Sequence, residues 1–207
     1  MSASDYDLLD AWRGGDAEAG NQLFERHFDS VCRFFRNKVN EGVDDLIQRT
    51  FLACVESKDA FRGDATFRTY LFTLARNTLY AHFKRTHKER DRLDPLEVSV
   101  HDLGPTPTGI VAKRKEQRVL LEALRAIPVE HQVTLELYYW EELSAADLGR
   151  VLGVPEGTVR TRIRRAKSLL EQAIERLQKG DADLASTMAN LEDWARSLRD
   201  QAGNEQK

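Results

Sequence analysis

A basic helical segment in the second half of this 207-residue chain has the composition of a DNA-reading helix. Apolar residues recur at helical spacing from Val159 to Leu177, and cationic and hydroxyl side chains fill the positions between them. Such a helix can lie in the DNA major groove, where its polar face contacts bases and phosphates. The polar positions of this helix are Arg160, Thr161, Arg162, Arg164, Arg165, Lys167 and Ser168.

The residues just before this helix predict a second, shorter helix and a sharp turn. Ser144 is a suitable N-cap, and Asp147 three residues later can complete a capping box. Gly153 stands where a helix end favours a left-handed residue, and Pro155 fits the first turn of the next helix. A basic amphipathic helix alone is often only a solvated surface. Combined with the capped helix and the turn, it indicates a helix-turn-helix.

Residues 61–90 interleave aromatic rings with basic side chains, which is how single-stranded nucleic acids are often bound. Aromatic residues at helical spacing are more often core, and we expect Phe67, Phe72 and Phe83 to be buried. The better candidates for contact are Tyr70, Asn77, Tyr80 and the basic residues Arg62, Arg68, Arg76, Lys84, Arg85, Lys88 and Arg90.

Other chemistry has little support in the sequence. The five histidines are scattered, and none has a cysteine or carboxylate at ligand or catalytic spacing, so we expect no enzyme activity, metal or cofactor. His27 is interpreted as a helix-face residue, and Cys32 and Cys54 as reduced, buried thiols. No apolar run approaches the ~18 residues that span a bilayer. An acidic, polar start also argues against a signal peptide, so we expect a cytoplasmic protein without membrane insertion.

The net charge of −3 looks wrong for a nucleic-acid-binding protein, but the charges are segregated. Basic residues concentrate at 84–92, 113–118 and 160–167, whereas the first 60 residues and the tail after Gly180 are acid-rich. Local basic faces, not the total charge, determine phosphate contact.

The periodicity predicts an all-α chain with two small helical domains, because no long stretch alternates at period two. We expect helices over 5–13, 16–38, 44–57 and 67–88, with a loop at 58–66. Prolines and glycines then predict an extended linker, followed by helices over 113–126 and from Pro128 onwards. The predicted domains are 1–92, the linker 93–112, the helix-turn-helix domain 113–179 and a C-terminal extension, 180–207, with a helix at 181–201. This extension either stabilises the second domain or regulates it.

Two blocks of the sequence resemble the extracytoplasmic-function (ECF, group 4) sigma factors of bacterial RNA polymerase, a class of the sigma-70 family. The first, VDDLIQRTFLACVESKDAFRGDATFRTYLFTLARNTLYAHFKR, is similar to region 2 of that family. The second, LRAIPVEHQVTLELYYWEELSAADLGRVLGVPEGTVRTRIRRAKSLL, is similar to region 4. The order of the blocks and the linker between them also agree with the family.

The resemblance implies a role for three sets of residues. Binding to the clamp helices of the largest subunit of core RNA polymerase is implied for Asp44, Asp45, Gln48 and Phe51. Contact with the melted −10 element, including a flipped non-template base, is implied for Arg62, Gly63, Arg68, Tyr70, Arg76, Asn77, Tyr80, Lys84 and Arg85. Reading of the −35 element is implied for Glu156, Gly157, Thr158, Arg160, Thr161, Arg164, Arg165 and Lys167, the first three through backbone amides that face phosphate.

The implied partners are promoter DNA, the clamp helices, the flap of the second-largest polymerase subunit and an anti-sigma factor. The chain departs from the family pattern at Tyr70, where tryptophan is usual, and at Ala81, where aspartate is common. Asp147 and Gly149 also stand where glutamate and alanine are usual. A helix-turn-helix regulator with an N-terminal protein-interaction domain is the alternative, but it leaves the aromatic and basic segment unexplained.

Overall fold

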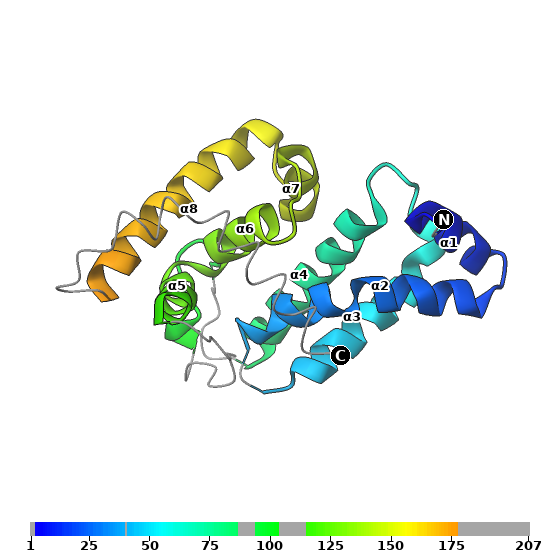
Figure 1. Ribbon diagram of the computed structural model, residues 1–207, viewed down its shortest axis with the longest axis horizontal. Helices are drawn as coiled ribbons and strands as arrows, with labels where there is room; N and C mark the ends of the chain where they lie inside the picture. The colour runs from blue at the N-terminus through cyan, green and yellow to red at the C-terminus, as the bar shows by residue number, and fades with distance from the viewer. Residues whose placement is uncertain (1–2, 40, 87–93, 104–114, 178–207) are drawn as a thin grey trace.

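The computed structural model describes residues 3–39, 41–86, 94–103 and 115–177, and Figure 1 shows their arrangement. Its α-helices within these ranges are α1 (Asp5–Arg13), α2 (Ala17–Arg36), α3 (Val43–Ser57), α4 (Phe67–Thr86), α5 (Lys115–Ala126), α6 (Val129–Tyr139), α7 (Ala145–Leu152) and α8 (Glu156–Leu177). Two short 3-10 helices, η1 (Lys58–Ala60) and η2 (His101–Leu103), lie in connections. The predicted all-α fold is confirmed. The predicted 181–201 helix and linker residues 104–112 lie outside the described residues.

Helices α1 to α4 form the N-terminal unit, and local capping explains where its first two helices begin. The Ser4 side chain accepts a hydrogen bond from the Asp7 amide in a capping box, and Asp16 accepts from two amides at the start of α2. Phe67, Phe72 and Phe83 are buried, as predicted for the inner face of α4. The unit is therefore built around the aromatic face that the periodicity indicated.

Helix α1 approaches α2 closely because residue 20 is a glycine. A Cβ atom at Gly20 would lie 2.7 Å from the Trp12 ring, much closer than a van der Waals contact allows. The Trp12 ring also packs edge-on against Phe24, with centroids 5.1 Å apart, and lies under the Lys58 ammonium. Gly20 thus sets the distance at which α1 lies against the rest of the unit.

Helices α5 to α8 form the C-terminal unit. Leu120 and Leu124 of α5 share a buried cluster with Leu135 of α6 and with Leu170 and Ile174 of α8. Short α7 crosses the end of α8, and Gly153 ends it with φ of 68°, the left-handed conformation predicted for this turn.

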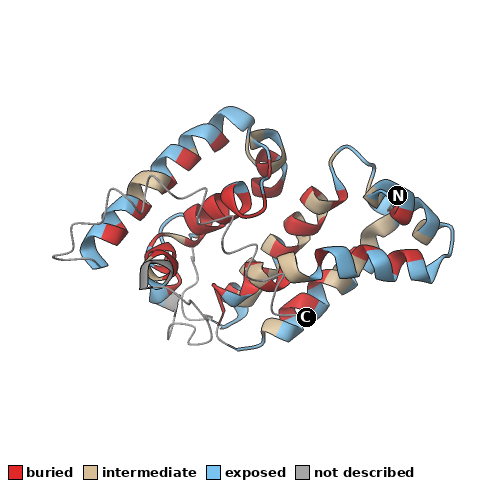
Figure 2. Cartoon of the chain, in the orientation of Figure 1, coloured by how far each residue is buried: buried red, intermediate tan, exposed pale blue. Residues whose placement is uncertain are grey.

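Helix α6 lies between the two units, in the middle of the molecule (Figure 1). All of its residues except Tyr138 are buried, and Figure 2 shows this as an almost unbroken buried colour. One apolar cluster extends from Phe72 and Leu79 of α4 to Val133 and Leu137 of α6. The two units therefore share a core, although the sequence predicts them as separate domains.

Buried polar side chains complete the packing of α6. The Lys38 ammonium is paired with Glu136 and donates to the Phe34 carbonyl at 2.7 Å. Asn37 donates to the same carboxylate at 3.0 Å and accepts from Arg125 at 2.9 Å. Burial lowers the pKa of Lys38, whereas the Glu136 carboxylate opposes that shift. Because each of these charges has a partner, α6 can be buried despite its polar sequence.

The described part of the linker, 94–103, holds the start of α6. The Pro95 carbonyl accepts from the Glu130 amide and the Val98 carbonyl from the Val129 amide, each at 2.9 Å. Ser99 forms an isolated antiparallel bridge with Pro128, and Val100 is buried. These carbonyls satisfy amides that a helix start leaves without partners. We call 94–103 the strap.

We predict opposite effects on stability for two glycine-to-alanine substitutions. Gly20→Ala displaces the Trp12 ring and lowers the free energy of unfolding by about 1–3 kcal/mol, typical of overpacking. Gly157→Ala, in α8, meets no atom within 4 Å and raises the free energy of unfolding by roughly 0.5–1 kcal/mol through its helix propensity. Urea denaturation measures both values. Equal effects at the two positions would contradict the close packing of α1 on α2.

Candidate nucleic-acid and protein interfaces

The α7–α8 segment has the geometry of a helix-turn-helix. The Ser144 hydroxyl accepts from the Asp147 amide at 3.1 Å, which confirms the N-cap. The Asp147 carboxylate accepts from the Ser144 hydroxyl at 2.6 Å. The observed cap thus differs from the predicted capping box, in which the carboxylate binds the Ser144 amide. A Cβ at Gly149 would lie 2.8 Å from the Val154 carbonyl oxygen, so the turn packs tightly on α7.

The residues predicted to read the −35 element lie along α8. All of them are exposed except Lys167, whose ammonium lies 5.1 Å from the centre of the Tyr139 ring. Arg160 bonds Glu156 one turn earlier at 2.6 Å, and its side chain is 70% exposed. Arg162 lies on the inner side of the helix, where it bonds Glu130 of α6 at 2.8 Å. The helix thus has an exposed cationic face and one inward-facing arginine.

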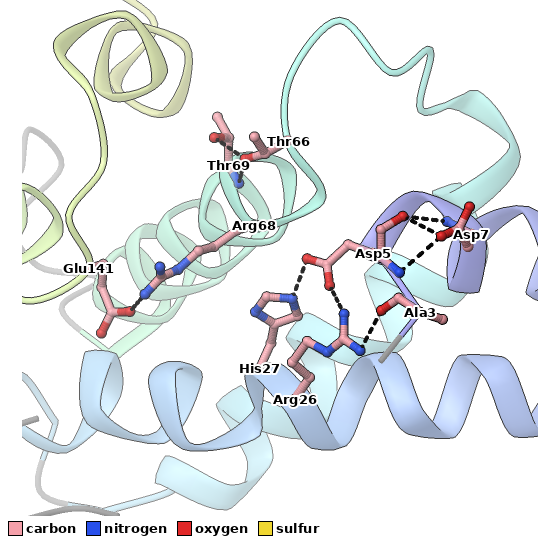
Figure 3. A network of polar contacts seen from close by, with 10 residues as sticks. Ala3, Asp5, Asp7, Arg26, His27, Thr66, Arg68, Thr69 and Glu141 are labelled. Atoms are coloured by element: carbon pink, nitrogen blue, oxygen red, sulfur yellow. Dashed lines mark hydrogen bonds and ion pairs between the residues drawn. The ribbon is translucent and has the colours of Figure 1, made fainter. Parts of the chain in front are cut away.

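The loop at 61–66 and the start of α4 carry the first of the predicted −10 residues. Arg62 and Gly63 are exposed, and Gly63 has a φ of 78°. The Tyr70 ring is half-buried and stacks on Phe61 with centroids 4.7 Å apart. The Thr66 hydroxyl accepts from the Thr69 amide at 3.1 Å, so a side chain caps α4 where the loop ends (Figure 3).

Three other predicted −10 residues face α6 and its C-terminal end and are paired with carboxylates there. Arg68 is paired with Glu141, as Figure 3 shows. Arg76 bonds Glu130 at 2.8 Å, and the Tyr80 hydroxyl donates to the same carboxylate. The remaining predicted residues of α4, Asn77, Lys84 and Arg85, are exposed.

Glu130 is the point at which the two predicted DNA-binding regions meet. It is 4% exposed, and its carboxylate accepts hydrogen bonds from Arg76 and Tyr80 of α4 and from Arg162 of α8. Two guanidinium groups and a phenol around one carboxylate resemble the contacts that proteins make with a phosphate group. Sequence reasoning missed Glu130, because a glutamate near a helix start is ordinarily a solvated residue.

The predicted polymerase-binding residues lie on α3. Asp44, Asp45 and Gln48 are exposed, and Phe51 is half-buried. Asp45 bonds Arg49 at 2.8 Å and lies 3.9 Å from Arg85.

Beside these residues lies an exposed apolar surface that the sequence interpretation did not include. Phe28 of α2 stacks on Phe51 with centroids 6.2 Å apart and is 44% exposed. Leu52 and Val55 of α3 are 53% and 41% exposed. Apolar side chains that gather on one face indicate a surface for another protein. The signal was present in the sequence, since α3 has more apolar positions than one inner face can bury.

Groups that could support other chemistry are accounted for within the described residues. No three histidine, cysteine or carboxylate side chains in this part of the chain are grouped to hold a metal ion. Cys32 and Cys54 are buried free thiols, and burial raises the pKa of Cys54 to about 12. His27 is buried and bonds Asp5 at 2.8 Å. The described helices include none with the length and apolar content needed to cross a bilayer.

Comparison with known proteins identifies both units. The sigma-70 region 2 model matches residues 23–89, and the sigma-70 region 4 model matches residues 117–170. The chain is 26% identical over 183 residues to the ECF RNA polymerase sigma-E factor of Haemophilus influenzae, covering 84% of this chain and 97% of that protein. The sigma-E factor of Escherichia coli K12 is 25% identical over 183 residues, 84% of this chain and 96% of its own length.

Two solved structures share the fold. CnrH, in complex with the cytosolic domain of CnrY, superposes with a TM-score of 0.62 at 22% identity, covering 84% of this chain and 99% of CnrH. RpoE of Bartonella quintana, in complex with the anti-sigma factor NepR, superposes with a TM-score of 0.58 at 18% identity, covering 75% of this chain and 96% of RpoE. The chain therefore belongs to the sigma-70 family of RNA polymerase initiation factors. Within that family it is an ECF sigma factor, a non-enzymatic protein that directs promoter-specific initiation of transcription.

Proposed function

We propose that the three predicted residue sets divide the work of initiation. The α3 face binds the clamp helices of the largest polymerase subunit, the 61–66 loop and α4 hold the melted −10 element, and α8 reads the −35 element. The observation that carries the proposal is the exposure of cationic α8 on a fold whose two units match regions 2 and 4. A helix-turn-helix regulator with an unrelated N-terminal domain would not match region 2.

The surface around α3 supports the first assignment. Two carboxylates and an amide lie next to exposed Phe28, Leu52 and Val55, so a partner helix would find a charged edge beside an apolar centre. Protein interfaces combine a desolvated apolar core with a polar rim in this way. The C-terminal unit would bind the flap of the second-largest subunit, as in the family.

The paired carboxylates imply that DNA binding requires the two units to separate. Arg68, Arg76 and Tyr80 cannot hold DNA phosphates while Glu141 and Glu130 occupy them. A hydrogen bond to a charged group is worth about 1.5–3 kcal/mol, but burying the charges offsets much of that gain. The closed arrangement is therefore one that polymerase binding can open, and free protein should bind promoters poorly.

An anti-sigma factor is a further proposed partner. RpoE of Bartonella quintana was solved with the anti-sigma factor NepR, and its fold superposes on 75% of this chain. Such a partner would act in the cytoplasm by covering the polymerase-binding or DNA-binding surfaces. The 180–207 extension remains a candidate for either stabilisation or regulation.

We predict that Asp44→Lys combined with Asp45→Lys weakens binding to core polymerase by at least about tenfold, since each lost ion pair at an interface costs on the order of 1 kcal/mol or more. Fluorescence-detected titration with core enzyme measures the affinity. The control, Asp59→Lys with Asp64→Lys, makes the same charge change elsewhere on the N-terminal unit and should bind normally. Unchanged affinity of the first variant would remove the assignment of α3.

Glu130→Gln should loosen the closed arrangement, because Arg76 and Arg162 then lack a counter-ion in a buried position. We expect the affinity of free protein for duplex promoter DNA to rise about three- to tenfold and the radius of gyration to increase. Anisotropy titration at fixed salt and small-angle X-ray scattering measure these two quantities. Glu171→Gln, on the exposed face of α8, removes the same charge and is the matched control. If both variants behave alike, Glu130 does not hold the units together.

Arg160→Ala or Arg164→Ala should weaken the free energy of promoter binding by the holoenzyme by about 1–3 kcal/mol where the side chain contacts a base edge. An arginine that holds a phosphate instead gives a shallower dependence of affinity on salt. Titration of matched and −35-substituted promoters at several salt concentrations distinguishes the two. Normal binding by both variants would place the recognition surface elsewhere.

A further inference from the structure

Helix α1 lies before the segment that matches region 2, yet its side chains bind the loop that follows α3. The Tyr6 hydroxyl donates to the Ala65 carbonyl at 2.8 Å and reaches the Gly63 carbonyl at 3.3 Å. The Arg13 guanidinium donates to the Lys58 carbonyl at 2.6 and 3.1 Å and also to the Phe61 carbonyl. Arg13, at the C-terminal end of α1, therefore binds main-chain carbonyls at the start of the 61–66 loop and just before it. Tyr6, near the N-terminal end of α1, binds carbonyls further along the loop.

Helix α1 is itself fixed firmly enough to serve as a support. Its first residue, Asp5, bonds Arg26 at 2.6 Å and His27 at 2.8 Å, both in α2, as Figure 3 shows. These partners hold the pKa of Asp5 below its ordinary value, which the His27 hydrogen bond does most to lower. At the other end, Trp12 packs against Gly20. Both ends of α1 are thus anchored to α2.

The two side chains act on the part of the loop that would meet a base. Phe61 stacks on Tyr70, and the Arg13 guanidinium lies 6.0 Å from the centre of the Phe61 ring. Gly63, whose carbonyl faces Tyr6, has the left-handed φ of 78°. Hydrogen bonds to four carbonyls between residues 58 and 65 restrict a backbone that would otherwise lose conformational freedom when a base enters.

We propose that α1 positions the base-holding loop of the −10 interface, with Tyr6 and Arg13 as its positioning residues. The inference rests on the proposed role of the loop and adds a region to it, since α1 touches neither DNA nor polymerase in this scheme. Its effect is on preorganisation: the loop is set before the base arrives, so that less binding energy is lost in ordering it.

The test measures how much of the holoenzyme's affinity for a single-stranded oligonucleotide comes from the base that it holds. Holoenzyme is titrated with a single-stranded non-template oligonucleotide that covers the −10 element of a promoter it opens, and with versions carrying one abasic site each. The position at which base removal costs most in the unsubstituted protein identifies the held base. We expect Tyr6→Phe and Arg13→Lys each to reduce the preference for the intact over that abasic oligonucleotide about fivefold, the size of one net hydrogen bond, because only part of the lost contact energy is transmitted to the base.

Core polymerase affinity should stay the same in both variants, and the midpoint of thermal unfolding should fall by only about 2–4 °C, because each change removes hydrogen bonds but no volume from the core. Tyr138→Phe removes a hydroxyl from an exposed tyrosine of α6 and is the matched control. Equal loss of affinity for intact and abasic oligonucleotides, or none, would overturn the positioning role. If no abasic site weakens binding of the unsubstituted holoenzyme, the proposed role of the loop fails instead, and the two failures are distinguishable.

Discussion

The closed form of the molecule depends on carboxylates of α6 and its C-terminal end that meet cations of the N-terminal unit. Glu130, Glu136 and Glu141 are all buried, and each is paired with a basic side chain of α2 or α4 or, for Glu136, with Lys38 just after α2. An unpaired buried carboxylate would cost several kcal/mol, so α6 can lie between the two units only while those partners are present. The same pairing that allows burial occupies side chains that a DNA-binding region needs, and this links packing to activity.

Local features of the sequence predict most of the helices and little of their arrangement. Ser144 caps α7 and Gly153 ends it as expected, and the inner phenylalanines of α4 are buried. The contacts of α6 could not be predicted in this way, because Asn37 and Lys38 meet Glu136 across about 98 residues of chain and periodicity carries no information at that range.

Residue type alone gives the wrong exposure at two places. Gln132 and Glu136 are of types that usually lie on a solvated helix face, but they are buried in the interface. Leu52 and Val55 belong to an apolar pattern but face outward on α3. In both places the side chain's surroundings are set by a second surface, that of the neighbouring unit for α6 and, in our proposal, that of the polymerase for α3. At both places the departure from binary patterning thus coincides with a surface that meets, or is proposed to meet, another unit.

The strap affects how far apart the two units can lie once they separate. Two main-chain hydrogen bonds, from the Val129 and Glu130 amides, hold it to α6, and it contains a turn and the 3-10 helix η2 instead of running straight. If these bonds break when the units part, the seven residues from Leu96 to Asp102 can extend to a span of at most about 25 Å. A connection that can lengthen in this way would let the second unit bind DNA at more than one distance from the first.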